Sequence, residues 1–491
     1  MNLYQNIYDL VDQLDSGQMS VTAYDTAWIA RLIDLGEPIG VKALEWLRGH
    51  QLEDGSWGMR DPYYAHDRVI STLAAMNALS RRGQPKDRTR LKRAEEALQQ
   101  ALVRLNLDQS GSTVGFELIV PTLLYEAQAL GVLQFQTNSI LHQLTPQREA
   151  KLAFLPHKVV NRLVSTGYSA EMAGLDGKDL IDAENLQESD GSVAFSPSST
   201  AYFALYIHRN DAKALQYLRH VASDGTAPIA FPASILERAI VFWNLALIKD
   251  FMDEDLLNLC RKKLGEVYSV WIPKRGVGFA PGHAATDCDN TSFLYDALVS
   301  FGYTPDLDAI LHYELPFYFR CYDYESTPSI SANLHVLGAL KRAGRSRNDP
   351  LIQKILRFIR GTRSENCMWF DKWNITPYYT TAHAIIVCSG FQAFDIVENS
   401  IEWILKMQNS DGSWGYVMPT AEETAYALQA LSIWNRRHGN IPPDVLKRGK
   451  NWLLRHADPP YPAFWVAKSL YCPTLIVRSI ILSALTLVKD L

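Results

Sequence analysis

The sequence is poor in cysteine, and its six cysteines are widely separated. No two of them form a CxxC motif or another paired spacing: they are Cys260, Cys288, Cys321, Cys367, Cys388 and Cys472. A disulfide framework and a zinc site both require cysteines at characteristic intervals, so neither is indicated. We therefore expect a protein of a reducing compartment, the cytoplasm.

An excess of basic charge is also lacking. The formal net charge is -5, which provides no basic footprint for nucleic acid. Lysine and arginine do gather in SRRGQPKDRTRLKR (80–93), but Asp87 and a Gly-Gln-Pro turn interrupt the run, which is typical of a solvated loop and helix start. The 491 residues, 47% hydrophobic and 21% charged, predict a folded protein of two to four domains.

Long apolar runs are scarce. The N-terminal MNLYQNIYDLVDQLDSG has neither the basic nor the apolar region of a secretory signal. The longest apolar stretch, TLIVRSIILSALTLV (474–488), carries Arg478 and is shorter than the roughly 20 residues that span a bilayer. A helix of the protein core is favoured there, and a peripheral contact of an amphipathic helix with a membrane surface stays open.

Strand-like alternation is rare, whereas apolar residues recur at intervals of three or four. This period predicts helices in DRVISTLAAMNAL (67–79), RLKRAEEALQQALVRL (90–105), LDAILHYEL (307–315), SANLHVLGALKRAG (331–344) and AEETAYALQALSIW (421–434). Thr420 and Glu423 stand at capping-box spacing before the last of these. Glycine and proline lie mainly between the segments, so we expect an all-α fold of antiparallel helix pairs with short loops.

A short motif recurs at unequal intervals. It combines glutamine, an Asp-Gly turn and a following aromatic or aliphatic residue, in QLEDGSWG (51–58), NLQESDGSVAF (185–195) and KMQNSDGSWGY (406–416). Asp-Gly ends a helix, the next side chain folds back, and the glutamine can bond to free backbone at a neighbouring helix end. We interpret the motif as a structural staple between the outer helices of an α-barrel.

The stretch ATDCDNTSFLYDAL (284–297) places Asp287, Asp289 and Asn290 directly before an apolar helical pattern. A calcium loop needs a longer alternation of ligands with a closing glutamate, and a magnesium site needs oxygens from more than one segment, so this spacing fits neither. By itself the pattern is typical of a capped helix start, with Thr286 or Asp287 as the cap and Asp289 in the first turn.

The staples together with this helix start resemble those of the class II terpene cyclases. Five further segments resemble the diterpene branch, in the same order and over nearly the whole chain: SVTAYDTAWIA (20–30), TVGFELIVPTLL (113–124), DGSVAFSPSSTAYFAL (190–205), DKWNITPYYTTAH (371–383) and PAFWVAKSLYC (462–472). The likeness is to bacterial halimadienyl and kolavenyl diphosphate synthases. It implies two α-barrel (α/α toroid) domains: a β-like domain of residues 1–17 and 229–491 and an inserted γ-like domain of residues 18–228. The resemblance also implies geranylgeranyl diphosphate as the substrate, bound between the domains.

The resemblance gives the aspartates a chemical role, because these enzymes begin by protonating an alkene with a carboxylic acid. It implies Asp289 as the donor and Asp287 as a neighbouring charge. An ordinary aspartate, with a pKa of about 3.9, is ionised at neutral pH, but burial and a second carboxylate raise that pKa. Asn290 stands where the family has a further aspartate, which affects the tuning of the acid. Asn333 resembles the asparagine that holds the acid in plant relatives, and we expect His335, two residues on, to face elsewhere.

The diphosphate needs cations close to an apolar pocket. The resemblance implies Glu117 as a Mg²⁺ ligand and Lys372 and Lys151 as diphosphate contacts; alone, Glu117 is equally typical of a buried ion pair. Aromatic residues in the matching segments could line the pocket and stabilise carbocations: Trp373, Tyr378, Tyr379 and Phe464.

The product is predicted from what is missing. The chain has no DDxxD, and MDEDLL (252–257) lacks that spacing, so the product should keep its diphosphate, and a class I terpene synthase acting downstream stays open. Plant copalyl diphosphate synthases hold a deprotonating water with a His/Asn pair, and the resemblance puts Tyr168 and approximately Ile229 at these positions. Neutral tyrosine is a poor base, so we expect hydride and methyl shifts and a rearranged clerodane (kolavenyl) or halimadane diphosphate.

Other functions remain open from the sequence. Within the class these are an unrearranged copalyl diphosphate synthase and a triterpene cyclase acting on squalene. An (α/α) barrel glycosidase is also helical and uses two carboxylates, but inverting enzymes hold them roughly 6.5–9.5 Å apart, which suits two aspartates in one helical turn poorly. A non-catalytic helical scaffold would not require Asp289.

Overall fold

The computed structural model describes residues 2–491, and it confirms the all-α fold. Its two strands in that range are β1 (Trp465–Val466) and β2 (Leu470–Tyr471), which pair antiparallel with Trp465 opposite Tyr471. The α-helices are α1 (Leu3–Asp12), α2 (Ala23–Ala30), α3 (Pro38–Gly49), α4 (Ala65–Ser80), α5 (Arg88–Leu102), α6 (Phe116–Ala129), α7 (Asn138–Ala153), α8 (Pro197–Tyr202), α9 (Ala212–Val221), α10 (Ser234–Ala246), α11 (Glu254–Tyr268), α12 (Cys288–Ser300), α13 (Asp308–Leu311), α14 (Ile330–Arg342), α15 (Pro350–Gly361), α16 (Pro377–Ser389), α17 (Phe394–Lys406), α18 (Ala421–His438), α19 (Pro443–Arg455) and α20 (Thr474–Leu487).

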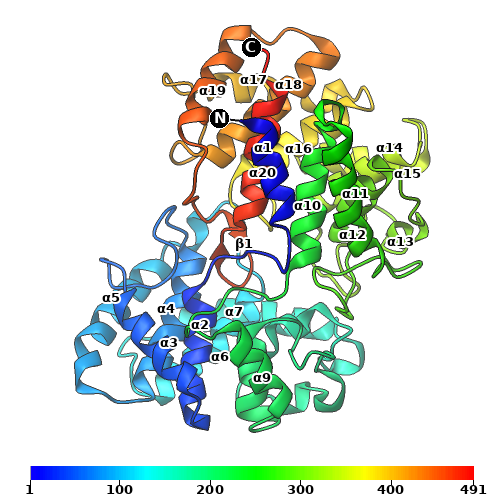
Figure 1. Ribbon diagram of the computed structural model, residues 1–491. Helices are drawn as coiled ribbons and strands as arrows, with labels where there is room; N and C mark the ends of the chain where they lie inside the picture. Colours follow the sequence, from blue (N-terminus) through cyan, green and yellow to red (C-terminus); the bar gives the residue numbers. More distant parts are fainter. Residues whose placement is uncertain (1) are drawn as a thin grey trace.

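The helices of the C-terminal half form a closed ring, the upper unit in Figure 1. Its inner helices pack pairwise in the order α10, α12, α14, α16, α18 and α20, and α20 returns to α10. The inner helices are buried on all sides; every residue of α16 is buried. The outer helices bury only one face. Helix α15, for example, buries Ile352, Ile355, Leu356 and Ile359, which recur at helical spacing.

The helices of the N-terminal half form a second, smaller ring below the first. Here α2, α4, α6, the 3-10 segment η5 (Ser165–Ala173) and α8 pack in turn, and α8 returns to α2. The outer helices α3, α5, α7 and α9 each cover one inner element.

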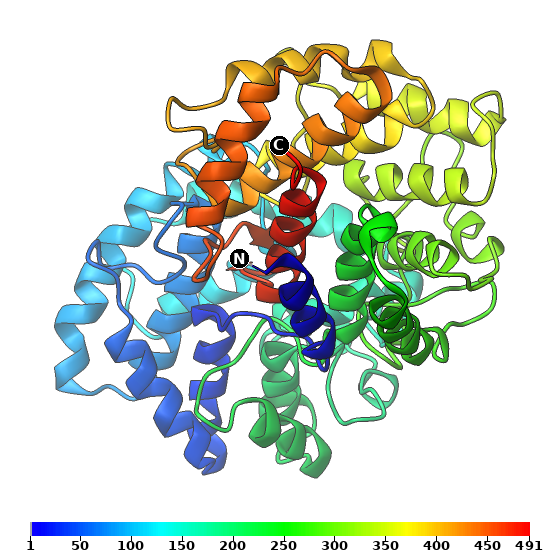
Figure 2. The same ribbon diagram turned by 45° about the horizontal axis from the view of Figure 1, so that its top comes forward.

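Buried apolar residues divide into two clusters that follow these rings. One runs from Ala23 to Ala227, and the other contains residues 7–14 together with Tyr64 and residues 229–488. Helix α1 therefore belongs to the C-terminal unit, where it lies beside α20 (Figures 1 and 2). Arg478 of α20 donates to Asn6 of α1 at 3.1 Å, which fixes this contact.

Each of the three Asp-Gly turns packs against an outer helix: α5, α9 or α19. Gly55, Gly191 and Gly412 all have φ above +90°, and a Cβ on Gly412 would lie 2.6 Å from the carbonyl oxygen of Arg448 in α19, so only glycine fits. Gln408 donates to Gly412 O and Val445 O, at 3.0 and 2.9 Å. The indole N–H of Trp414 donates to Ile404 O of the preceding helix at 2.7 Å.

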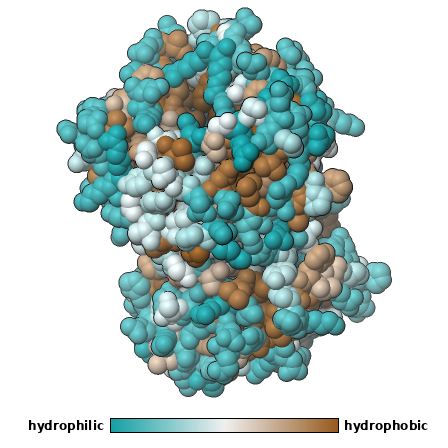
Figure 3. Space-filling model, turned by 90° about the vertical axis from the view of Figure 1, so that its right-hand side faces the viewer, coloured by the Kyte–Doolittle hydropathy of each residue, from teal (hydrophilic) through white to brown (hydrophobic). Residues whose placement is uncertain are grey.

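The surface is mainly hydrophilic, with apolar patches above and below the waist between the two units (Figure 3). Helix α20, which contains the longest apolar stretch, is an inner helix of the ring and is buried along almost its whole length, so it is a core helix and offers no face to a membrane. Across residues 2–491, no helix is both long and apolar enough to cross a membrane. All six cysteines are free.

Candidate active site

A cavity of about 460 Å³ lies where the two units meet, a size typical of small-molecule sites. The smaller ring contributes the loop 110–115, Lys151 and residues 165–169. The larger ring contributes residues 229–240, the start of α12, the loop 321–327 and the segment around Trp373. Asp287, Asp289 and Asn290 all line this cavity.

Asp287 caps α12, as the capping interpretation of the sequence predicts. Its Oδ1 accepts from the backbone N–H of Asn290 at 2.7 Å, and its Oδ2 accepts from the Asn290 side-chain amide at 2.9 Å. Burial raises the pKa of Asp287 to about 7 in spite of these hydrogen bonds. The asparagine that departs from the family pattern thus holds Asp287 rather than Asp289.

Asp289 is a cavity-lining acid with a strongly raised pKa. Its side chain keeps 17% exposure, and burial raises its pKa to about 8. The Asp371 carboxylate raises the pKa further, while the Lys372 ammonium lowers it. Asp371 is thus a further carboxylate that acts on Asp289, and the charge of Asp289 in turn raises the pKa of Asp287.

The side chain of Asp371, which precedes α16, is held by hydrogen bonds from the start of α14. It accepts from the backbone N–H of Ile330 and from the hydroxyl of Ser331, both at 2.7 Å, and Ser329 lies within hydrogen-bond distance. These hydrogen bonds hold the Asp371 side chain at the N-terminus of α14, where a carboxylate is favoured by the helix dipole.

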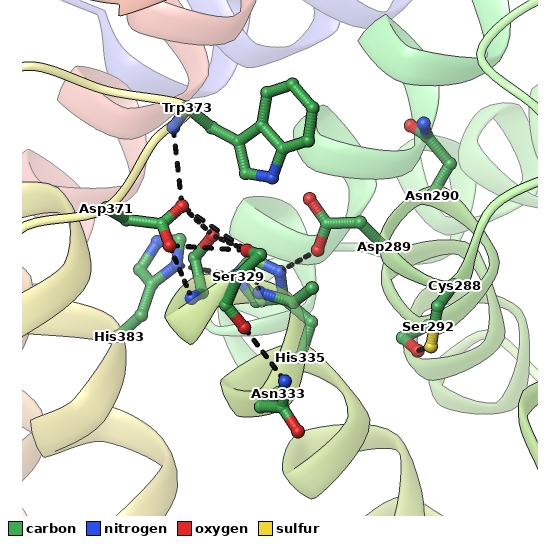
Figure 4. A network of polar contacts seen from close by, with 12 residues as sticks. Cys288, Asp289, Asn290, Ser292, Ser329, Asn333, His335, Asp371, Trp373 and His383 are labelled. Carbon is green, nitrogen blue, oxygen red and sulfur yellow. Dashed lines mark hydrogen bonds and ion pairs between the residues drawn. The ribbon is translucent and has the colours of Figure 1, made fainter. Parts of the chain in front are cut away.

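His335 is the hydrogen-bond partner of Asp289. Its Nδ1 lies 2.5 Å from Oδ1 of Asp289, and its Nε2 lies 2.8 Å from Nδ1 of His383 (Figure 4). Burial lowers the pKa of His335 to about 3 and that of His383 well below its usual value, so both rings are neutral. The side chain of His335 is fully buried.

Asn333 does not hold the acid, so this expectation is wrong. Its amide donates to Phe319 O and Ser329 O and accepts from Phe319 N, each at 2.8 Å. Figure 4 shows it pointing away from Asp289. Residues two apart on a helix lie about 200° apart, so only one of Asn333 and His335 can face Asp289, and the loop at Phe319 binds the asparagine.

The predicted cationic residues lie at the cavity as ion pairs. Lys372 pairs with Glu325 and also donates to Thr327 O at 2.7 Å. Lys151 pairs with Glu117 across α7 and α6. Lys151, Lys372 and Glu325 line the cavity, whereas Glu117 lies buried behind Lys151 and outside the lining.

Three of the predicted aromatic residues line the cavity: Tyr168, Trp373 and Tyr379. The Tyr168 hydroxyl donates a hydrogen bond to Ile229 O at 2.8 Å. The two positions that were compared with the plant His/Asn pair are therefore in contact. Tyr378 and Phe464 are outside the lining, contrary to expectation: Tyr378 packs against Trp403 and Phe464 is buried in the core. The sequence could not separate them from Tyr379 because all three are equally apolar and buried.

The turn between β1 and β2 carries a buried cation into the smaller ring. Lys468 is fully buried, pairs with Glu171 at 2.6 Å, and donates to Ser196 and Ser198 at 2.8 and 2.6 Å. Its ammonium lies 4.6 Å from the centre of the Tyr168 ring. Sequence reasoning missed this residue, because a lone lysine in PAFWVAKSLYC has no recognisable ligand pattern.

The chain provides few ligands for a metal. Within residues 2–491 there is no group of three or more histidine, cysteine or acidic side chains placed to hold an ion. Mg²⁺ commonly binds through one or two carboxylates with substrate phosphates and water completing its shell. Glu117 beside Lys151 therefore fits an ion carried by a diphosphate, but these residues do not form an all-protein site.

Comparison with known proteins extends these observations. The sequence model of the squalene-hopene cyclase C-terminal domain matches residues 320–459. The chain is 42% identical over 488 residues to the type B diterpene cyclase of Mycobacterium tuberculosis, covering 96% of both chains. It is 28% identical to an ent-copalyl diphosphate synthase of a Streptomyces species, covering 98% of this chain and 96% of the relative.

A solved structure shares the whole architecture. The ent-copalyl diphosphate synthase from Streptomyces platensis matches 99% of both chains, with a TM-score of 0.80 and 26% identity. The 42% identity to the type B diterpene cyclase over nearly the full length of both chains, on this fold, shows that the chain belongs to the class II diterpene cyclases.

Proposed function

We propose that the enzyme cyclises geranylgeranyl diphosphate by protonation of its terminal alkene and releases a bicyclic product that keeps its diphosphate. The observation that carries this proposal is Asp289, a cavity-lining acid whose pKa is raised to about 8. At neutral pH it holds the proton that the reaction requires, whereas an ordinary aspartate would have lost it.

The histidine pair orients that proton. Because each neutral imidazole carries one N–H, a donor at His383 Nδ1 directs its hydrogen to His335 Nε2, and His335 then donates from Nδ1 to Oδ1 of Asp289. The acidic proton is left on Oδ2, free to reach the alkene. After transfer, the His335 N–H stabilises the new carboxylate.

The diphosphate would lie toward Lys372 and Lys151, whose ion pairs with Glu325 and Glu117 open to accept it. Mg²⁺ bound with the diphosphate would use Glu117 as its protein carboxylate and would neutralise the phosphate charge. We also propose that residues 18–228 form the γ-like domain and that residues 1–17 and 229–491 form the β-like domain; the division of the buried core supports this.

For the product we propose a rearranged skeleton of the clerodane (kolavenyl) or halimadane type. Burial raises the pKa of Tyr168 well above its usual value, and its hydroxyl is engaged by Ile229 O, so the phenol is a poor base for early deprotonation. If the wild type makes copalyl diphosphate, the proposed rearranged skeleton is wrong. A less rearranged product from Tyr168→His would support it.

The central experiment incubates the purified enzyme with geranylgeranyl diphosphate and Mg²⁺, removes the diphosphate and identifies the alcohol. The Asp289→Asn variant should fold and lose cyclisation by several orders of magnitude, since an amide cannot protonate an alkene. A folded Asp289→Asn with near-normal turnover would reject the mechanism. Incubation with squalene tests the triterpene alternative, and addition of a class I terpene synthase tests whether the product feeds such an enzyme.

A further inference from the structure

The cavity contains a histidine to which the initiating chemistry gives no role. His283 lies in the loop between α11 and α12, lines the cavity, and is 5% exposed. Its Nδ1 is buried without a hydrogen-bond partner among residues 2–491. Nearly all buried polar atoms are paired, so an unpaired one inside a binding cavity suggests a partner among the bound molecules.

The side-chain contacts of His283 are aromatic. Phe279 lies with its ring centre 4.5 Å from that of the imidazole, and Phe195 meets it edge to face at 5.6 Å. The ring centre of Phe279 in turn lies 6.2 Å from that of Tyr168. Phe279 therefore separates His283 from Tyr168, which binds Ile229 O. Burial lowers the pKa of His283 to about 3, which keeps it uncharged.

Several other polar groups at the cavity are already engaged with protein partners. Lys151 and Lys372 are cations, Glu325 is neutralised by Lys372, and Asp287 is held by two hydrogen bonds from Asn290. Tyr168 has a phenol oxygen engaged with Ile229 O. An uncharged imidazole has one nitrogen with a free lone pair, and aromatic walls around it tolerate a nearby carbocation.

We propose that His283 accepts the proton that ends the cyclisation; this rests on the proposed function. The final carbocation loses a proton from the carbon next to the cationic centre to the imidazole lone pair. The electrons of the broken C–H bond form the product's ring double bond, and the imidazole becomes imidazolium. The diphosphate stays attached throughout.

The charges and protons balance over one turnover. Asp289 has given a proton and is a carboxylate, and His283 has gained one, so the positive charge of the intermediate ends on the protein. Because a C–H bond beside a carbocation is extremely acidic, a weak base suffices if it is placed within reach, and position rather than basicity selects the carbon that is deprotonated. Water entering as product leaves returns both groups to their starting states.

The test replaces the imidazole while leaving its aromatic volume. His283→Phe should still consume geranylgeranyl diphosphate, because Asp289 remains, but the share of the wild-type product should fall roughly tenfold or more in favour of double-bond isomers and water-quenched alcohols. His283→Gln is measured in parallel, since its amide can hold a water and should favour the hydroxylated diphosphate. If His283→Phe fails to fold, the product of His283→Gln tests the proposed role of His283.

The matched control is His456→Phe at the end of α19. His456 stacks on Trp452 and is outside the cavity lining, so its product should match that of the wild type. An unchanged product ratio in folded His283 variants would overturn the proposal. So would loss of substrate consumption, which would place His283 in initiation. Failure of the wild type to cyclise the substrate would instead reject the proposed function.

Discussion

Nδ1 of His335 lies 2.5 Å from Oδ1 of Asp289, while Nε2 of the same ring lies 2.8 Å from Nδ1 of His383. The proposed acid, Asp289, is therefore held by a neutral histidine from the adjacent inner helix, α14. Neutrality matters because an imidazolium in the same place would favour the ionised acid and leave it without its proton.

We expect His335→Phe to lower the rate of substrate consumption about 100-fold, because the ring shape is kept while the hydrogen bond to Asp289 is lost. Single-turnover kinetics measure the effect on the chemical step. Asn333→Ala is the control: it should cost about 1–3 kcal/mol of stability by unpairing the loop at Phe319, with little change in kcat. The reverse pattern, with Asn333→Ala slower than His335→Phe, would contradict the assignment.

The rate should depend on pH through Asp289. The protonated form is active, and its pKa is raised to about 8, so kcat/KM should be level near pH 7 and decline as the pH passes 8. A profile between pH 6 and 10 on the purified enzyme measures this, with folding checked by circular dichroism at each pH. Activity that stays constant to pH 10 would show that Asp289 is not the donor.

The same shift predicts the stability of Asp289→Asn. Between pH 4 and 8 the folded enzyme keeps a proton on Asp289 that the unfolded chain releases, so wild-type stability falls as the pH rises through this window. The asparagine variant lacks this cost. Its Tm should therefore exceed that of the wild type by more at pH 8 than at pH 5, as measured by calorimetry; an equal difference at both values would argue against the raised pKa.

Lys372→Met should raise KM for geranylgeranyl diphosphate about tenfold or more without changing the product, since a charge-assisted contact to the diphosphate is lost. The single change also leaves Glu325 buried and unpaired. Lys372→Met combined with Glu325→Gln separates the two effects, because it removes the cation without a stranded carboxylate. If the double variant binds substrate normally, Lys372 is only a structural partner of Glu325.

Glu117→Gln should raise the Mg²⁺ concentration needed for half-maximal activity and leave the product unchanged. Titration of Mg²⁺ at saturating substrate measures this. Lys151→Gln distinguishes the roles, since it should affect substrate affinity more than the metal requirement. Identical Mg²⁺ curves for wild type and Glu117→Gln would remove Glu117 from the metal site.

Much of the architecture follows from the sequence because helical periodicity, Asp-Gly turns and capping residues act locally. Local rules also predict the helix start at which Asp287 and Asp289 stand, but the role of Asp289 as an acid came from the family resemblance. The family resemblance added Lys151, Lys372 and Tyr168, which the structure brings to one cavity.

The partners of the acid could not be predicted, because they come from other helices. Whether Asn333 or His335 faces Asp289 depends on the rotation of α14 about its axis, and both residues are fully buried, so hydropathy does not fix that rotation. Asp371 and His383 reach the site from still later segments. His283 carried no signal at all, since a single histidine in FAPGHAAT is as typical of a loop as of a cavity wall.

Lys468 has a consequence for how a twenty-carbon chain enters and leaves. Its ammonium and the Glu171 carboxylate are both fully withdrawn from solvent, one from each ring. Separating the rings would break this pair, together with the hydrogen bonds from Lys468 to Ser196 and Ser198. The turn between β1 and β2 therefore links the two barrels beside the cavity, and movement of the cavity loops would give substrate and product a route that leaves this link intact.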